Sequence, residues 1–296
     1  MRTANPLNTL IVFTCLVLVT SNLAEAQTKL LLQAHRGGRG LKPENTIPAM
    51  KNALDLGADL ELDVYLTHDH QLVVSHEDHI PSALALTASG DTLAKASEAG
   101  LGLPHLDYNQ IEKYDVGTKF NPAFPQKASI KVSMPLLTRL IDSVETYAKA
   151  KHYKLPSYNI EAKLPKGKNL INGYRESVLK AMVALLRKKH MQRRVIIQSF
   201  DTEMLEIMHK KYSDFSLSYL VQTGNAEKNL SNLSFTPAYY SPNYHILHQP
   251  DVELCHQKSI KVIPWTVNTV DEMKALKSMA VDGLISDYPN LYKILN

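Results

Sequence analysis

Short apolar or β-branched runs alternate along the chain with segments in which apolar residues recur at helical spacing. The runs predict strands and the periodic segments predict amphipathic helices. Strands are expected over residues 29–34, 60–66, 72–75, 158–162, 195–198, 216–221, 239–241, 261–266 and 283–286. Helices are expected over residues 46–56, 136–150, 172–190, 202–212, 225–233, 250–258 and 269–278, the first of them capped by Asn45 or Thr46.

Repeated strand–helix units over about 270 residues predict an α/β fold of the (β/α)8 TIM-barrel type. An open doubly wound sheet is the runner-up, but no Gly-x-Gly-x-x-Gly follows the first strand. Residues 77–134 do not fit the repeat, because they are rich in Ala, Ser, Gly and Pro and show no clear strand–helix unit. So long a segment predicts a functional insertion over the catalytic face, with a poorly ordered surface loop as the alternative.

The first 26 residues predict a secretory signal peptide. Arg2 precedes an apolar run from Leu10 to Val19, and Ala24-Glu25-Ala26 has the small-x-small form of a cleavage site before Gln27. The apolar run is about ten residues long, whereas a bilayer-spanning helix needs roughly 20. We therefore expect export to a periplasm or to the medium, a single mature domain over residues 27–296, and no stable membrane anchor.

Composition and charge exclude several classes. At 44% hydrophobic and 21% charged residues the chain is ordinary for a globular protein. Its 33 Lys and Arg against 29 Asp and Glu leave a small positive charge, and the longest basic run is Arg187–Lys189, so nucleic-acid binding is not expected. Of the two cysteines, Cys15 lies in the signal and Cys255 is left alone, which rules out a disulfide scaffold.

The end of the first predicted strand carries candidate chemistry. His35 and Arg36 lie where barrel enzymes keep their active sites, at the C-terminal end of a strand. The glycines that follow allow close approach of backbone to a ligand, and Asn45 or Thr46 opens a helix whose N-terminus favours an anion. Alone, the motif is equally typical of a surface turn with a helix cap.

Acidic residues repeat at a spacing of two on later strands. Glu61 and Asp63 share one face of a strand, and two carboxylates aimed together into an apolar barrel favour a bound Mg²⁺ or Ca²⁺. The alternative is a half-exposed strand with solvated acids. Glu161 and Lys163 share a face in the same way, as a third metal carboxylate and a phosphate partner, or as a simple ion pair.

A histidine is brought near these acids by a hairpin. Five residues separate Leu66 from Leu72, too few for a parallel crossover, so the two strands should form a hairpin centred near residue 69. That hairpin places His76 beside Asp63, although a surface histidine is the alternative. Trp265, the only tryptophan, either lines a small pocket or plugs the barrel.

Taken in order, these motifs resemble the glycerophosphodiester phosphodiesterase family, a branch of the phosphatidylinositol phospholipase C-like barrels, over about residues 30–292. The chain departs from the family in having Glu77 where Asp usually follows the second histidine, and in lacking an Asp-Arg-Thr-Thr-like stretch after it. The resemblance rests on His35-Arg36-Gly37, Pro43-Glu44-Asn45-Thr46, Glu61-Leu62-Asp63, His76, Glu161-Ala162-Lys163, Gln198-Ser199-Phe200, Trp265-Thr266 and Asp282 through Pro289.

The resemblance implies a distorted barrel with one divalent cation, Ca²⁺ or Mg²⁺. It implies that His35 and His76 are the acid–base pair. It also implies the remaining assignments: Glu61, Asp63 and Glu161 as metal carboxylates, Arg36 and Lys163 as phosphate partners, and Glu44 on the metal side of the pocket, acting through water.

The implied activity is hydrolysis of a small glycerophosphodiester to glycerol 3-phosphate and an alcohol through a cyclic phosphate. A lysophospholipase D-like enzyme is the nearest alternative, with an apolar groove expected in the insertion. A non-catalytic glycerophosphodiester-binding protein and a structural protein of the cell envelope are the others. Paired histidines and metal carboxylates favour an enzyme, because a binding protein needs no paired acid and base.

Overall fold

The computed structural model describes residues 30–295, apart from the Lys168 side chain. The secretory signal expected over residues 1–26 therefore lies outside the described residues. Within the described part, no helix combines the length and apolarity that crossing a bilayer requires. Cys255 is a buried free thiol.

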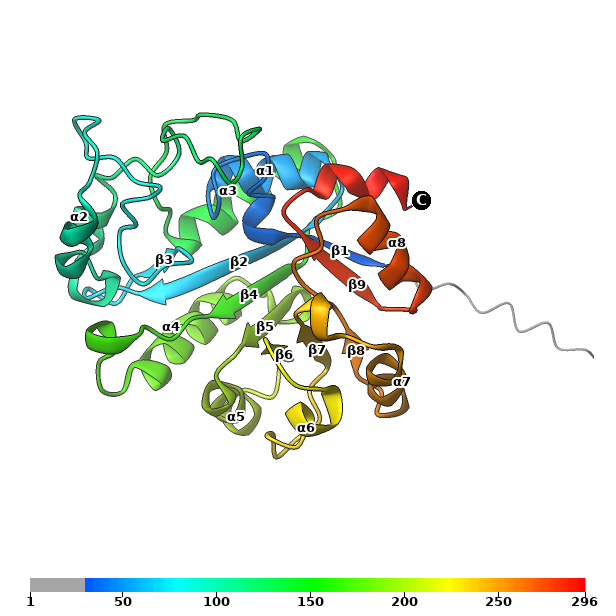
Figure 1. Ribbon diagram of the computed structural model, residues 1–296. Coiled ribbons are helices and arrows are strands. Elements are labelled where there is room, and N and C mark those ends of the chain that lie inside the picture. Colours follow the sequence, from blue (N-terminus) through cyan, green and yellow to red (C-terminus); the bar gives the residue numbers. More distant parts are fainter. Residues whose placement is uncertain (1–29, 296) are drawn as a thin grey trace, which may run out of the picture.

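Eight parallel strands surround the core in the order β8-β7-β6-β5-β4-β2-β1-β9, and β3 pairs only with β2 (Figure 1). This arrangement confirms the (β/α)8 barrel and excludes the open doubly wound sheet. The strands are β1 Leu31–Ala34, β2 Asp59–Leu66, β3 Leu72–Val74, β4 Tyr158–Ala162, β5 Val195–Ser199, β6 Ser216–Val221, β7 Tyr239–Pro242, β8 Lys261–Val262 and β9 Gly283–Ser286.

Apart from α2, which lies in the insertion after β3 and was not expected, helices cover the outside of the barrel close to their expected positions (Figure 1). Thr46 is the N-cap of the first helix, since its hydroxyl accepts a hydrogen bond from the Ala49 amide. Asn45, the other candidate, is not the cap. The helices are α1 Ile47–Asp55, α2 Tyr108–Ile111, α3 Leu137–Ala150, α4 Tyr174–Lys188, α5 Thr202–Lys211, α6 Ala226–Leu230, α7 Gln249–Gln257 and α8 Val270–Ser278.

The barrel is distorted at the seam between β8 and β9. The strand expected over residues 261–266 is wrong in length, because β8 ends at Val262. Pro264 has no amide hydrogen to donate, which interrupts the ladder. The seam closes through separate backbone bonds instead, from Asp282 N to Val262 O (2.9 Å), from Ile285 N to Pro264 O (3.1 Å) and from Val267 N to Ile285 O (2.9 Å). The chain after β8 is thereby free to follow an irregular path over the end of the barrel.

The β2–β3 hairpin has the expected register. Val64 pairs with Val74, so the hairpin is centred on residue 69. The Ser75 amide continues the pairing by donating to the Asp63 carbonyl oxygen (3.1 Å). The next residue, His76, is therefore brought beside the strand that carries Glu61 and Asp63, as the sequence predicts.

The insertion after β3 contains α2 and short 3-10 turns but no strand–helix unit. One buried carboxylate organises it, because Asp115 accepts from the amides of Gly117 (2.9 Å), Thr118 (3.2 Å) and Val132 (3.2 Å). The insertion lies on the side of the molecule toward which β2 and β4 point (Figure 1). It therefore adjoins the end of the barrel where the candidate residues gather.

Both faces of β2 are buried, but they differ in chemistry. Leu60, Leu62 and Val64 are fully buried on one face. Glu61 and Asp63 alternate with them and therefore point into the barrel. Those two side chains are only 2% and 1% exposed. Buried acidic side chains at one end of the barrel interior indicate a functional site there, because such groups add little to a hydrophobic core.

Candidate active site

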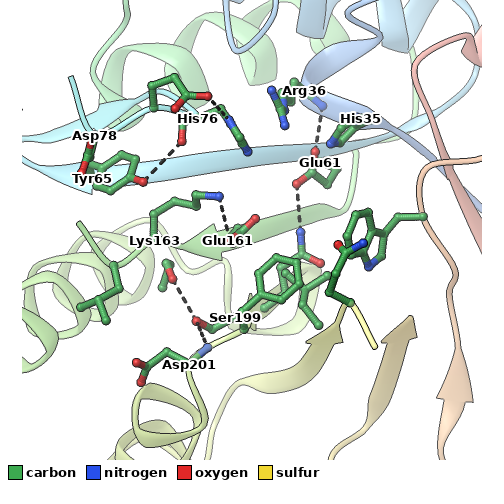
Figure 2. Close-up of a pocket in the computed structure, with 18 of the residues that line it drawn as sticks. His35, Arg36, Glu61, Tyr65, His76, Asp78, Glu161, Lys163, Ser199 and Asp201 are labelled. Carbon is green, nitrogen blue, oxygen red and sulfur yellow. Dashed lines mark hydrogen bonds and ion pairs between the residues drawn. The ribbon is translucent and has the colours of Figure 1, made fainter. Parts of the chain in front are cut away.

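A pocket of about 620 Å³ opens at the C-terminal end of the barrel. Figure 2 shows His35 and Glu61 on one side of its polar part, and His76 and Lys163 on the other. Seven of the nine residues predicted from the sequence line it: His35, Arg36, Glu61, His76, Glu161, Lys163 and Trp265. The fold thus brings together residues that are spread over 231 positions of the chain.

Three buried carboxylates form a cluster within the barrel end. One oxygen from each of Glu61, Asp63 and Glu161 lies within 4.8 Å of the others. The cluster spans two neighbouring strands, because Asp63 on β2 pairs with Glu161 on β4. Three carboxylate oxygens at this spacing are hard ligands that suit Ca²⁺ or Mg²⁺.

Two cations compensate part of this negative charge. The Lys163 Nζ atom lies 3.0 Å from Glu161 Oε1 and 3.7 Å from Asp63 Oδ1. The Arg36 guanidinium lies 3.4 Å from Asp63 Oδ2 and 2.8 Å from Glu44 Oε1. When all are ionised, the three cluster carboxylates and Glu44 carry four negative charges, and Arg36 and Lys163 carry two positive ones. The remaining charge of two is that of one divalent cation.

Burial and mutual repulsion perturb the carboxylates in different directions. Burial, followed by the Asp63 charge, raises the pKa of Glu61 well above its usual range. Burial also raises the pKa of Glu161 to about 8, against the opposing charge of Lys163. Burial acts on Asp63 too, but Lys163 and Arg36 outweigh it and hold the pKa of Asp63 below its usual range. In the absence of a cation the cluster therefore retains protons at neutral pH.

The segment that follows β1 forms hydrogen bonds to both Glu61 and Asp63. Arg36 adopts a left-handed conformation (φ 51°), which costs about 1–2 kcal/mol for a residue with a Cβ. In return its amide donates to Glu61 Oε2 (2.8 Å). Asn45 Nδ2 donates to Asp63 Oδ2 (2.8 Å), and Asp63 N donates back to Asn45 Oδ1 (3.3 Å). Strain at such a turn is typical of a functional site.

His35 is held by a carboxylate from the last strand. Its Nδ1 lies 2.6 Å from Asp287 Oδ1, and Arg39 Nε donates to the same oxygen (2.7 Å). Burial, with Arg36 next, lowers the pKa of His35 to about 4, although Asp287 opposes the shift. A neutral imidazole that donates from Nδ1 keeps the lone pair of Nε2 for a substrate proton.

His76 has a more open environment and its own carboxylate. Its Nδ1 lies 2.7 Å from Glu77 Oε1, and its side chain is 31% exposed. The hydrogen bond to His76 lowers the pKa of Glu77 to about 2. Glu77 therefore provides an ionised partner for the imidazole.

The opposite wall of the pocket is apolar. Leu164, Phe200, Leu220 and Trp265 line it. The Phe200 and Trp265 rings meet edge to face, with centroids 5.5 Å apart, and Trp265 Nε1 donates to the Ser241 carbonyl oxygen. Trp265 thus lines the pocket, which settles the choice left open by the sequence.

Two of the predicted residues lie outside the lining of this pocket. Asp63 is covered by the side chains bonded to it. Glu44 lines a separate cavity of about 20 Å³ behind His76, and its contact in the site is the ion pair with Arg36. Glu44 is also absent from the carboxylate cluster of the described residues.

Sequence reasoning missed several partners of these residues. Asn45 supports Asp63, Asp287 supports His35, and Gln198 Nε2 donates to Glu61 Oε1 (2.9 Å). All three lie in motifs quoted for the family resemblance. Asp287 stands one residue beyond β9, Asn45 directly precedes the N-cap of α1, and Gln198 is the next-to-last residue of β5; these positions were the signal available for them.

Barrel enzymes of this architecture keep their reactive groups at the C-terminal ends of the strands. Here that end offers acid–base groups beside two cations that suit a phosphate, facing an apolar wall. Fold and site together define the class of barrel phosphodiesterases.

The comparison with known proteins makes the assignment more specific. The model of the glycerophosphoryl diester phosphodiesterase family matches residues 35–291, and the chain belongs to this family of phosphoric diester hydrolases. A glycerophosphodiester phosphodiesterase of Caldanaerobacter subterraneus subsp. tengcongensis is 31% identical over 88% of this chain and 95% of its own length.

Solved structures agree on the fold. A Silicibacter pomeroyi protein assigned to the glycerophosphoryl diester phosphodiesterases superposes with a TM-score of 0.81 at 26% identity, over 90% of this chain and 93% of its own. An Oleispira antarctica phosphodiesterase, solved with the product sn-glycerol-3-phosphate, has a TM-score of 0.69 at 21% identity, over 90% of this chain and 96% of its own.

Proposed function

We propose that the enzyme hydrolyses glycerophosphodiesters to glycerol 3-phosphate and an alcohol by histidine acid–base catalysis with one divalent cation, Ca²⁺ or Mg²⁺. The observation that carries this proposal is the pair of carboxylate-supported histidines in one pocket with the buried carboxylate cluster. Glu61, Asp63 and Glu161 would hold the cation. When bound, the cation neutralises charge on a phosphate oxygen and lowers the pKa of a bound hydroxyl.

The two histidines differ in environment, which suggests which of them acts first as the base. His35 is neutral at pH 7, since its pKa is lowered to about 4, and its Nε2 is free. It would remove the proton from the glycerol 2-hydroxyl, which then attacks phosphorus. His76, next to the ionised Glu77, would donate a proton to the departing alcohol oxygen.

The second half of the reaction reverses these roles. The P–O bond to the alcohol has broken, and the new bond to the 2-oxygen closes a cyclic phosphate. His76, now neutral, would take a proton from water as the water oxygen attacks phosphorus. His35 would return its proton to the 2-oxygen, giving glycerol 3-phosphate and restoring both imidazoles. Arg36 and Lys163 would stabilise charge on the phosphate oxygens throughout.

Substitution of each histidine tests the assignment. His35→Ala and His76→Ala should each lower kcat by about 10²–10⁴-fold. His68→Ala is the matched control, because His68 is an exposed loop histidine with its own carboxylate partner, and its activity should equal that of the wild type. Retention of more than about a tenth of kcat by either active-site variant would overturn its role.

The cyclic phosphate has its own test. A glycerophosphodiester methylated on the 2-oxygen has no nucleophile and should not be cleaved, whereas ³¹P NMR should detect the cyclic phosphate during turnover of the unmodified substrate. Cleavage of the methylated compound at the normal rate would show direct attack by water instead.

The apolar wall supports a second candidate, a lysophospholipase D-like activity. These residues come from the ends of the strands and the loops that follow them, and not from the insertion, where the groove was expected: Leu164, Phe200, Leu220 and Trp265. Such a wall could contact an acyl chain on the glycerol unit. A kcat/KM on lysophosphatidylcholine above that on glycerophosphocholine would select this activity, and the reverse order would select the first.

We also propose that the enzyme is exported, to a periplasm or to the medium, after cleavage before Gln27. The support is the sequence pattern of the first 26 residues. N-terminal sequencing of the protein recovered from its producing cells should start at Gln27. A start at Met1 in the soluble cell fraction would contradict the proposal.

A further inference from the structure

Three amide side chains fill the barrel interior next to the carboxylate cluster. Gln33 on β1, Asn159 on β4 and Gln198 on β5 are only 1–2% exposed. Branched apolar residues are the usual filling of such a barrel. Burying an amide this deeply costs free energy unless its polar atoms are hydrogen-bonded.

The amides form one chain of hydrogen bonds that ends on Glu61. Gln198 Nε2 donates to Glu61 Oε1 (2.9 Å), and Asn159 Nδ2 donates to Gln198 Oε1 (3.0 Å) and to Gln33 Oε1 (2.8 Å). A Glu61 carboxylate that binds a cation must be ionised, and an ionised carboxylate can only accept. It therefore requires the NH₂ group of Gln198 on its side, which turns the Gln198 carbonyl to Asn159 and requires an NH₂ group there in turn.

This direction of donation leaves one group unpaired. Asn159 Oδ1 is buried and has no hydrogen-bond partner within residues 30–295. Turning the Asn159 amide over would not help, because its oxygen would then face the carbonyl oxygens of Gln198 and Gln33. The arrangement gives up one hydrogen bond at Asn159 and thereby keeps a donor directed at Gln198.

The other oxygen of Glu61 is also fixed. Arg36 N donates to Glu61 Oε2 (2.8 Å), so each carboxylate oxygen accepts one hydrogen bond from the protein. A carboxylate oxygen has two acceptor positions, and one remains on each oxygen for a cation. The amides therefore set the rotation of the carboxylate without occupying its ligand positions.

We propose that Gln198 and Asn159 are positioning residues that hold Glu61 ready to bind the cation. This inference rests on the proposed function, in which Glu61 is a metal ligand. Asn159 acts through Gln198, because its NH₂ group keeps the Gln198 amide from turning its carbonyl oxygen toward Glu61. Groups that orient a ligand in this way commonly change metal affinity about 10–100-fold when they are removed.

The test is cation binding by the purified chelator-treated enzyme, measured by isothermal titration calorimetry with Ca²⁺ and with Mg²⁺. Gln198→Met removes the donor at similar length and should weaken binding about 10–100-fold. Asn159→Leu leaves both Glu61 and the net charge unchanged and should still weaken binding, by about threefold or more. The cation concentration for half-maximal activity should rise in parallel, while kcat at saturating cation stays within about threefold.

Ser218→Ala is the matched control. Ser218 is fully buried and hydrogen-bonded to Ser241 on the neighbouring strand (2.9 Å), so its loss removes a buried hydrogen bond without affecting Glu61. Its cation affinity should equal that of the wild type. Gln198→Asn, which keeps an amide but shortens its reach, provides a second variant in case Gln198→Met fails to fold.

The outcomes separate the two proposals. Wild-type enzyme that binds neither cation would overturn the metal site, and this inference with it. Wild-type enzyme that binds a cation, with Gln198→Asn and Asn159→Leu binding it equally well, would overturn the positioning role alone. A fall in melting temperature with an unchanged cation curve would likewise show that the amides only support the fold.

Discussion

Cation binding should be strongly coupled to protons, because the carboxylate cluster is protonated in part when it is empty of metal. The pKa of Glu161 is raised to about 8, first by burial and then by Asp63 against the effect of Lys163. Metal ligands must be deprotonated, so a cation bound to the cluster would displace this proton. Acidification should therefore weaken binding well before any ordinary carboxylate titrates.

The size of the effect follows from this pKa. At pH 6 about one molecule in a hundred has an ionised Glu161, whereas at pH 8 about half do. The apparent affinity should thus rise about 50-fold between these two pH values, or about 2 kcal/mol, from this one group. The raised pKa of Glu61 adds to the dependence, so at pH 6, where Glu161 is almost fully protonated, between one and two protons should be released.

Calorimetric titration with Ca²⁺ or Mg²⁺ measures both quantities, since buffers of different ionisation enthalpy report the released protons. At pH 6, Glu161→Gln should bind more weakly and release one proton fewer. Glu203→Gln, which changes an exposed carboxylate of α5, should match the wild type. A change of less than about threefold in wild-type affinity between pH 6 and pH 8, without proton release, would refute this reasoning.

Three further predictions concern the turn after β1 and its partners. Asp287→Asn should lower kcat by about 10²–10⁴-fold, because an amide can donate to His35 and favour the wrong tautomer; a loss below tenfold would contradict that role. Gly37→Ala should lower stability by about 1–3 kcal/mol in denaturant titration, since Gly37 has φ +79° and a Cβ would lie 2.8 Å from Ala49 Cβ; an unchanged midpoint would contradict this. His35 has its pKa lowered from 6.5 to about 4 by burial and Arg36, with Arg39 adding and Asp287 opposing, so below pH 6.5 the unfolded chain binds a proton that the folded chain refuses. The unfolding free energy should therefore fall by about 2 kcal/mol from pH 7 to pH 5, and a His35→Gln variant should lose less over the same interval.

Local sequence patterns were sufficient to predict those features of the fold and site that depend on short-range geometry. The alternation of β2 directs Glu61 and Asp63 to one face, and the five-residue hairpin connection fixes the position of His76. The strand–helix alternation also predicts the barrel and most of its elements. Each of these inferences needs only the period of a strand or the length of a loop.

The remaining features depend on contacts that close the barrel. Asp287 reaches His35 because β9 pairs with β1, and Gln198 reaches Glu61 across the interior. No periodicity of the sequence encodes which side chains meet across a closed barrel. The strand after residue 260 was overpredicted for a local reason, since the apolar pattern outweighed the missing amide hydrogen of Pro264.

The contact between His35 and Asp287 joins positions 252 residues apart, near the two ends of the described chain. Of the described strands, β1 is synthesised first and β9 last, and they pair from Leu31 with Gly283 to Ala34 with Ser286. A nascent polypeptide therefore cannot form this contact until Asp287 has left the ribosome. For the same reason, cleavage just before Asp287 leaves a chain with every other predicted site residue but without the carboxylate that holds His35.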